Sequence, residues 1–95
     1  MLFVLHALDR PDALPRRIAA YDAHKAFLSD TSALGVQIVM SGPLVADDGE
    51  TMKGSFFLIE APDRATVEAF NRADPFHAAD VWEQITITAF LRRQG

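Results

Sequence analysis

The order of strand-like and helix-like segments is the feature that most constrains the fold of this chain. Short apolar runs bounded by turn residues are typical of buried strands, and they lie at residues 2–8, 36–40, 54–60 and 81–91. Helical spacing follows the first run and the third. The order β-α-β-β-α-β is that of the ferredoxin-like arrangement, a four-stranded antiparallel sheet with two helices on one face. We therefore predict an α+β fold of this kind in one domain, residues 1–95.

Local signals predict where the helices and turns begin and end. Asp12 and Asp63 are candidate N-caps, because a carboxylate there accepts hydrogen bonds from the first turn of a helix. Gly35 is expected to end the first helix after about Leu34, since glycine adopts the left-handed conformation without strain. Asp47-Asp48-Gly49 predicts a hairpin turn between the second and third strands. The core-facing positions expected in the second helix are Val67, Phe70 and Ala73.

The apolar content of the chain is high for its length, with 49% hydrophobic and 23% charged residues. The two helices cover only one face of the predicted sheet. The strands carry more apolar surface than that face uses, in Leu2, Val4, Phe57, Ile59, Ile85 and Ile87. A second copy of the chain would cover the remainder, so we predict a homodimer joined through its sheet faces.

Composition argues against several classes of partner and cofactor. The net charge is −4, with basic residues scattered among acidic ones, which disfavours nucleic-acid binding. The chain has no cysteine, and no apolar run approaches the roughly 20 residues that span a membrane. The three histidines are not spaced as metal ligands, and no phosphate-binding motif occurs, so we expect neither a metal nor a cofactor. A cytoplasmic location is the corresponding expectation.

The first helix carries a histidine and an arginine on its apolar side. On a helical wheel, His24 lies near the centre of a stripe, with Arg17 beside it; the stripe consists of Leu14, Ala20, Tyr21, Phe27, Leu28 and Leu34. Both groups are costly to bury without partners. His24 is either a core histidine satisfied by one hydrogen bond or a proton carrier that faces a cavity.

Asp74-Pro75 predicts a break after the second helix. Proline forces the preceding residue out of the helical region and suits the first position of a new helix. Asp74 is then an N-cap whose carboxylate accepts from the backbone N–H of Phe76 or His77. If one oxygen caps while the other faces a pocket, Asp74 would also hold the ring of His24 in one orientation.

Ser41-Gly42-Pro43 is expected to close the second strand. Glycine lets the backbone approach a ligand closely, and the Ser41 hydroxyl can donate a hydrogen bond. The same residues also suit a plain strand exit. Under the first interpretation, Ser41 and Gly42 join Arg17 as candidate substrate-binding residues.

These motifs together resemble the YciI-like family, the YCII-related domain, over nearly the whole chain. The segments that carry the resemblance are residues 1–8 and 9–14, Ala23-His24-Lys25, Gly35, Ser41-Gly42-Pro43-Leu44, Lys53-Gly54-Ser55, Asp74-Pro75-Phe76 and Val81-Trp82-Glu83. One departure is Thr88-Ala89-Phe90, where many members have proline. That change affects the exit of the last strand more than it affects chemistry.

The resemblance implies both an assembly and a chemistry. It implies a ferredoxin-like subunit that dimerises as an α/β barrel, with an active-site histidine and aspartate carried over to His24 and Asp74. It also implies cofactor-free chemistry on small chlorinated or hydroxylated ring compounds, of a dehydrochlorinase or isomerase type.

Two functions are consistent with these residues. In the first, the protein is a cofactor-independent lyase or isomerase for a small aromatic or anionic molecule, with His24 moving a proton and Asp74 orienting it. Arg17 and Ser41-Gly42 would then hold the developing oxyanion. In the second, it is a non-catalytic ligand-binding or dimerisation module in which His24 and Asp74 only stabilise the core and a helix cap. A separation above about 8 Å between the two side chains would exclude a His24–Asp74 pair.

Overall fold

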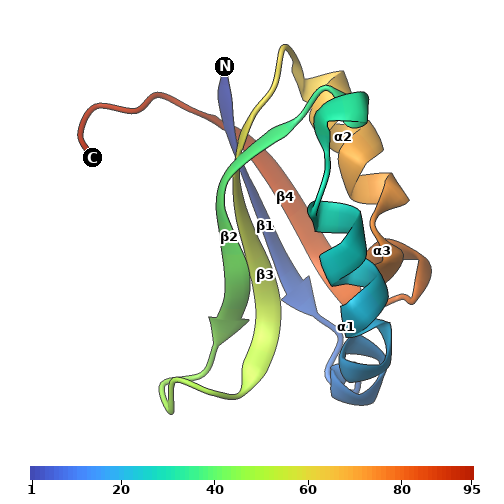
Figure 1. The fold of residues 1–95 in the computed structure, drawn as a ribbon. Helices are drawn as coiled ribbons and strands as arrows, with labels where there is room; N and C mark the ends of the chain where they lie inside the picture. Colours follow the sequence, from blue (N-terminus) through green and yellow to red (C-terminus); the bar gives the residue numbers. More distant parts are fainter.

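Figure 1 shows the order of helices and strands in the computed structural model, which describes all 95 residues. The strands are β1 (Leu2–Asp9), β2 (Gln37–Val45), β3 (Met52–Glu60) and β4 (Trp82–Phe90). The helices are α1 (Leu14–Leu28), α2 (Arg64–Ala73) and α3 (Pro75–Ala78), with a 3-10 turn at Ser32–Leu34. The predicted ferredoxin-like order is confirmed, and α3 is the short helix expected after Asp74-Pro75. None of the helices has both the length and the apolar content to cross a bilayer.

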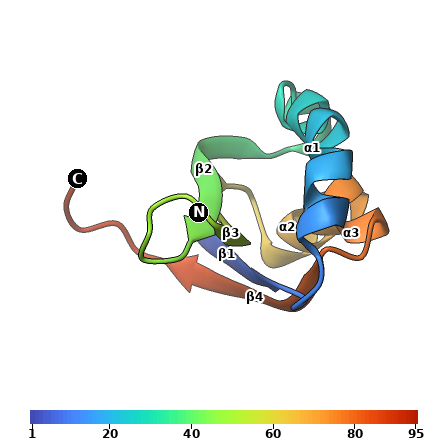
Figure 2. The same cartoon turned by 90° about the horizontal axis from the view of Figure 1, so that it is seen from below.

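The sheet has the strand order β2-β3-β1-β4, and every neighbouring pair is antiparallel. Figure 2 shows α1, α2 and α3 together on one side of this sheet, while the C-terminal residues extend away on the other side. The core lies between these two layers. Its largest fully buried side chains are Leu5, Phe57, Ile59, Val67, Phe70, Phe76 and Val81.

The caps of α2 and α3 form as predicted. Asp63 accepts a hydrogen bond from the Thr66 backbone N–H at 2.8 Å, and Asp74 accepts one from the Phe76 N–H at 2.9 Å. Of the three core positions expected on α2, Val67 and Phe70 are buried but Ala73 is exposed.

The predictions for the ends of α1 are wrong. The N-cap is Ala13, with no side-chain cap, and Asp12 instead lies 3.6 Å from Arg16 as an ion pair. The helix ends at Leu28, because the Ser29 hydroxyl bonds back to the Ala26 carbonyl and competes with further helical turns. Gly35 does adopt the left-handed conformation, at φ +72°, but it ends the 3-10 turn.

The buried side of α1 is polar, contrary to the expected apolar stripe. Arg17 and His24 are its buried residues. Leu14 and Tyr21, which were expected to be buried, are 40% and 48% exposed. Polar contacts to other elements therefore hold much of this helix against the sheet.

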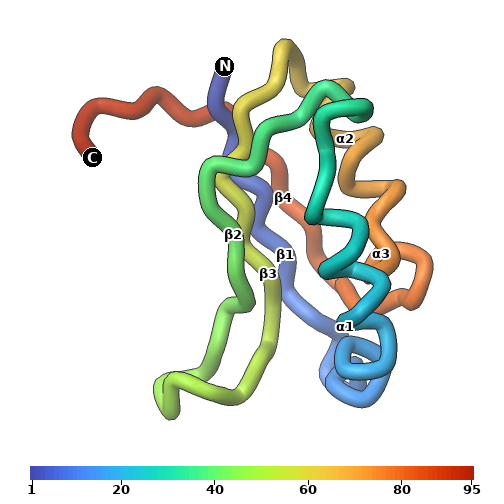
Figure 3. The backbone as a smooth tube through the Cα atoms, in the orientation of Figure 1, coloured from blue at the N-terminus to red at the C-terminus, as the bar shows by residue number.

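Strand β2 is longer than predicted, and Ser41-Gly42-Pro43 lies inside it rather than at its exit. Proline is tolerated there because β2 is an edge strand, where a missing ladder hydrogen bond costs little. Figure 3 shows β2 and β3 running together into a hairpin. At the tip of this hairpin Gly49 has φ +78°, as the predicted turn requires.

The sheet face opposite the helices is partly apolar. Cross-strand pairing places Met40, Leu58, Val4 and Thr88 in one row of this open face, and Gly42, Phe56, His6 and Thr86 in the next. Leu2 and Phe90 pair at its end. Of the six apolar strand residues named from the sequence, Leu2 and Val4 lie on the open face and the other four do not. Those four share the helix-covered face with Leu5 by register: Phe57, Ile59, Ile85 and Ile87.

We predict that Asp48→Ala destabilises the hairpin in a pH-dependent way. The hydroxyl of Thr51, together with the Thr51 and Glu50 backbone N–H groups, donates to Asp48 and lowers its pKa to about 2. The stabilisation is then fully present above the unfolded-state value of about 4 and is lost as the pH falls through about 2. The difference in melting temperature between Asp48→Ala and wild type, followed by circular dichroism, should be constant above about pH 5 and shrink below about pH 4.

Asp47→Ala is the matched control, because Asp47 belongs to the same turn and its side chain makes none of these hydrogen bonds. Equal, pH-independent effects of the two substitutions would contradict the prediction.

Candidate active site

His24 and Asp74 meet in the protein interior although they are far apart in sequence. His24 Nδ1 lies 2.8 Å from Asp74 Oδ1, well inside the limit set for a pair. The His24 side chain is 11% exposed and that of Asp74 is fully buried. Helix α1 supplies the histidine, and the corner between α2 and α3 supplies the aspartate.

Asp74 combines a helix cap with its contact to His24. Its Oδ1 atom accepts from both the Phe76 N–H and the imidazole, whereas its Oδ2 atom is buried without a partner. When Asp74 is an ionised carboxylate it only accepts hydrogen bonds, so the His24 donor is Nδ1–H, and in the neutral imidazole Nε2 then carries the lone pair. That Nε2 atom makes no hydrogen bond within the chain and remains accessible.

Arg17 is held by a buried polar network beside His24. Its Nε and Nη2 atoms donate to the two oxygens of Asp9 at 2.8 and 2.9 Å, and Nη2 also donates to Ser55 Oγ at 2.7 Å. Trp82 Nε1 donates to the same Ser55 oxygen at 3.2 Å. The remaining guanidinium nitrogen, Nη1, makes no hydrogen bond within the chain and remains accessible.

The ring of Phe76 fixes the orientation of both groups. The His24 imidazole stacks on it with centroids 3.8 Å apart and planes 10° from parallel. The Arg17 guanidinium carbon lies 4.7 Å from the same ring centroid, within the range of a cation–π contact. Asp74 positions Phe76 through the helix cap, so one corner of the fold orients the imidazole in two ways.

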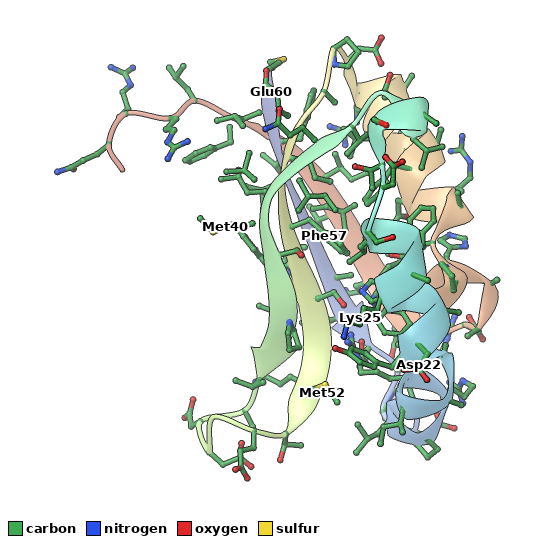
Figure 4. The ribbon with its side chains drawn as sticks, viewed as in Figure 1. Asp22, Lys25, Met40, Met52, Phe57 and Glu60 are labelled. Carbon is green, nitrogen blue, oxygen red and sulfur yellow. The ribbon has the colours of Figure 1, made fainter.

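A pocket of about 270 Å³ opens between α1 and the β2–β3 hairpin strands. Its polar lining consists of Arg17, Tyr21, His24, Lys25, Ser41 and Ser55. The rest is formed by Leu28, Gly42, Pro43, Met52, Phe57 and Phe76. Figure 4 shows Lys25 reaching from α1 toward the sheet, with Met52 and Phe57 on β3.

Four of the five candidate residues from the sequence line this pocket: Arg17, His24, Ser41 and Gly42. Asp74 is not part of the lining; it contacts two lining residues, the His24 ring and the Phe76 backbone. Ser41 pairs with Phe57 across the sheet, which puts its side chain on the helix-covered face. The expectation that one Asp74 oxygen faces the pocket is therefore not met, because the second oxygen, Oδ2, is buried outside the lining.

Several lining residues were missed by sequence reasoning. Tyr21 and Leu28 belong to the expected stripe on α1, although neither was named as a binding residue. Lys25 was missed, and its helical interval of four residues from Tyr21 was a usable signal. Ser55 gave no such signal, because its place in the site depends on the pairing of β3 with β2.

The other two histidines lie elsewhere. His6 is exposed on the open sheet face and His77 is exposed on α3. No three residues of the histidine, cysteine, aspartate and glutamate types cluster as metal ligands would.

A model of the YCII-related domain matches residues 1–91 of the chain. The chain belongs to the YCII-related domain family. The YciI proteins of Escherichia coli O6:H1 and Shigella flexneri are each 30% identical to this domain in a 97-residue alignment, which covers 97% of this chain and 98% of theirs. The resemblance noted from the sequence motifs is thereby confirmed.

A solved structure also resembles this YCII-related domain closely. It is the 5-chloro-2-hydroxyhydroquinone dehydrochlorinase TftG from Burkholderia phenoliruptrix, in complex with 2,5-dihydroxybenzoquinone. The two chains superpose with a TM-score of 0.85 and 33% sequence identity, over 98% of this chain and 96% of TftG.

We predict that Asp9→Asn lowers the free energy of unfolding by about 3–5 kcal/mol, because it leaves the buried Arg17 charge without its partner. The side chains of Arg17 and Asp9 are only 4% and 6% exposed. Denaturant titration measures the effect, and the double variant Asp9→Asn/Arg17→Met should be less destabilised than the two single changes sum to.

Asp80→Asn is the control, because it breaks the exposed Arg10–Asp80 pair, whose side chains are 41% and 69% exposed. Its expected cost is about 1 kcal/mol or less. If Asp9→Asn costs no more than Asp80→Asn, the buried pair does not hold α1 in place.

Proposed function

We propose that this protein is a cofactor-independent enzyme, of lyase or isomerase type, for a small hydroxylated or chlorinated ring compound. The observation that carries the proposal is the His24–Asp74 hydrogen bond of 2.8 Å at a pocket to which His24 presents a free Nε2 atom. TftG, which resembles this chain in fold and sequence, is a dehydrochlorinase that binds a ring compound. This likeness supports the same class of reaction here.

His24 is the general base in this proposal. Its Nδ1–H bond to Asp74 leaves the Nε2 lone pair directed to the pocket, and a carboxylate behind the ring stabilises the imidazolium that forms. Stacking on Phe76 restricts rotation of the ring. Asp74 is a positioning residue, because it touches His24 rather than the pocket.

The reaction needs no oxidant or reductant. His24 Nε2 takes a proton from the ring compound, and the electron pair left behind expels chloride as the carbon–chlorine bond breaks. In an isomerase reaction, the same imidazolium returns the proton to another atom of the ring. In both cases negative charge develops on a ring oxygen before the second bond changes.

Arg17, Ser41 and the backbone at Gly42 would stabilise that oxygen. Asp9 already balances the charge of Arg17, so the guanidinium contributes through the free hydrogen-bond donors on Nη1 rather than through net charge. Ser41 offers a hydroxyl from the opposite wall of the pocket. Gly42 lies on an edge strand, whose outer backbone groups have no strand partner.

We further propose that the protein works as a cytoplasmic homodimer joined through the open sheet face. This face carries Val4, Met40, Phe56, Leu58 and Phe90, of which Met40 is 55% and Phe90 42% exposed. An isologous contact between two copies would cover these side chains and leave both pockets, on the helix side, accessible.

We predict that Asp74→Asn keeps the helix cap of α3 but removes the negative charge behind His24, so that stability is retained and activity is lost. Asparagine is as good an N-cap as aspartate, so stability should stay within about 1 kcal/mol of wild type. Loss of the carboxylate behind His24 should lower kcat/KM by about 100-fold or more, measured as chloride release from 5-chloro-2-hydroxyhydroquinone.

Asp63→Asn is the matched control, since it makes the same change at the α2 cap, outside the pocket, and should leave turnover unchanged. His24→Asn keeps a donor toward Asp74 while removing Nε2, and it should abolish the same activity. Full turnover in His24→Asn would refute the proposed catalytic role of His24. It would favour the alternative of a non-catalytic module with structural His24 and Asp74.

We predict that Val4→Glu converts the protein to a monomer, because a charge at the centre of the open face is costly to bury between two copies. Size-exclusion chromatography with light scattering measures the mass. Ile18→Glu, at a 60% exposed position on α1, is the control and should leave the dimer intact. A wild-type protein that elutes as a monomer at micromolar concentration would refute the dimer.

A further inference from the structure

The polar lining of the pocket contains no carboxylate, although the chain as a whole has a net charge of −4. Asp9 and Asp74, the acidic side chains that bond to lining residues, are buried behind Arg17 and His24 and do not line the pocket. A concave site lined by bases and hydroxyls in an acidic protein attracts anions selectively.

Lys25 is the one lining base without a partner. Arg17 is paired with Asp9 and His24 with Asp74, whereas Lys25 takes part in none of the ion pairs of the chain. Asp22 lies three residues before Lys25 on α1, about 60° away around the helix, but the two side chains form no ion pair. The Lys25 ammonium therefore has no direct ion-pair partner within the chain.

Lys25 and Arg17 lie toward opposite ends of the pocket wall formed by α1. Their backbone positions are about two helical turns apart, roughly 12 Å along the axis. His24 directly precedes Lys25 in the chain, and its ring stacks on the same Phe76 ring that the Arg17 guanidinium contacts. Figure 4 shows the Lys25 side chain directed from α1 across the space toward β3. A ring compound with its reacting group at His24 and one oxygen near Arg17 would thus place a second substituent near the ammonium.

We propose that Lys25 is a specificity-determining residue that selects ring compounds carrying a negatively charged oxygen distant from the reacting group. This inference rests on the proposed function, since it assigns the substrate class of the same pocket. The Lys25 ammonium binds a phenolate, enolate or carboxylate oxygen, and the Tyr21 hydroxyl, one turn earlier on the same wall, donates a hydrogen bond to it. Neutral rings of the same size lack this contact.

Isothermal titration calorimetry with two matched probes tests the proposal. One probe is 2,5-dihydroxybenzoquinone, which ionises, and the other is its neutral dimethyl ether, 2,5-dimethoxybenzoquinone. Lys25→Met should weaken binding of the dihydroxy probe about tenfold at low salt and leave the affinity for the ether unchanged. Lys25→Arg should restore most of the loss, and added salt should weaken wild type more than Lys25→Met.

Lys53→Met is the matched control, because it removes the only other lysine, which lies outside the pocket. It should bind both probes as wild type does. If wild type binds the dihydroxy probe and Lys25→Met binds it equally well, the role of Lys25 is refuted and the proposed function stands. If wild type binds neither probe, the proposed function and the role of Lys25 both fail.

Discussion

One carboxylate oxygen joins three helices of this domain. Asp74 Oδ1 accepts hydrogen bonds from the first turn of α3 and from His24 on α1, and Asp74 itself ends α2. The position of α1 depends on this contact because the helix buries little apolar surface; its main aromatic anchor, Phe27 on Phe70, lies in the last turn. The distance from α1 to the hairpin strands sets the pocket width. The interaction that orients the imidazole therefore also shapes the space in front of it.

Most of the features that local chemistry decides were predictable from the sequence, although the cap expected at Asp12 does not form. The caps at Asp63 and Asp74 and the turn at Gly49 each depend on a few neighbouring residues, and all three form. The end of α1 and the position of Ser41-Gly42-Pro43 were not predictable in the same way. A strand extends as far as its partner pairs with it, and β3 pairs with β2 for two residues beyond Pro43, to Val45.

The residues of the candidate site were likewise predictable where local sequence signals identify them, and not where sheet pairing brings them together. His24 and Arg17 stood out because a polar group at a helix position turned inward needs a partner, and Asp74 stood out because proline follows it. The partners Asp9 and Ser55 were missed, since strands β1 and β3 bring them to Arg17 only through sheet register. The stripe on α1 is less buried than expected because the inward side of the helix borders a pocket, in line with the interpretation that placed His24 at a cavity.

The shared hydroxyl of Ser55 gives the protein an intrinsic optical reporter. Trp82 is the only tryptophan of the chain, it is 5% exposed, and its indole N–H bonds to the same oxygen that holds Arg17 at the pocket wall. A ligand that draws Arg17 toward itself alters the hydrogen bonding of that indole. We therefore expect a ligand in the pocket to shift the emission spectrum of Trp82, and no second tryptophan contributes to that signal.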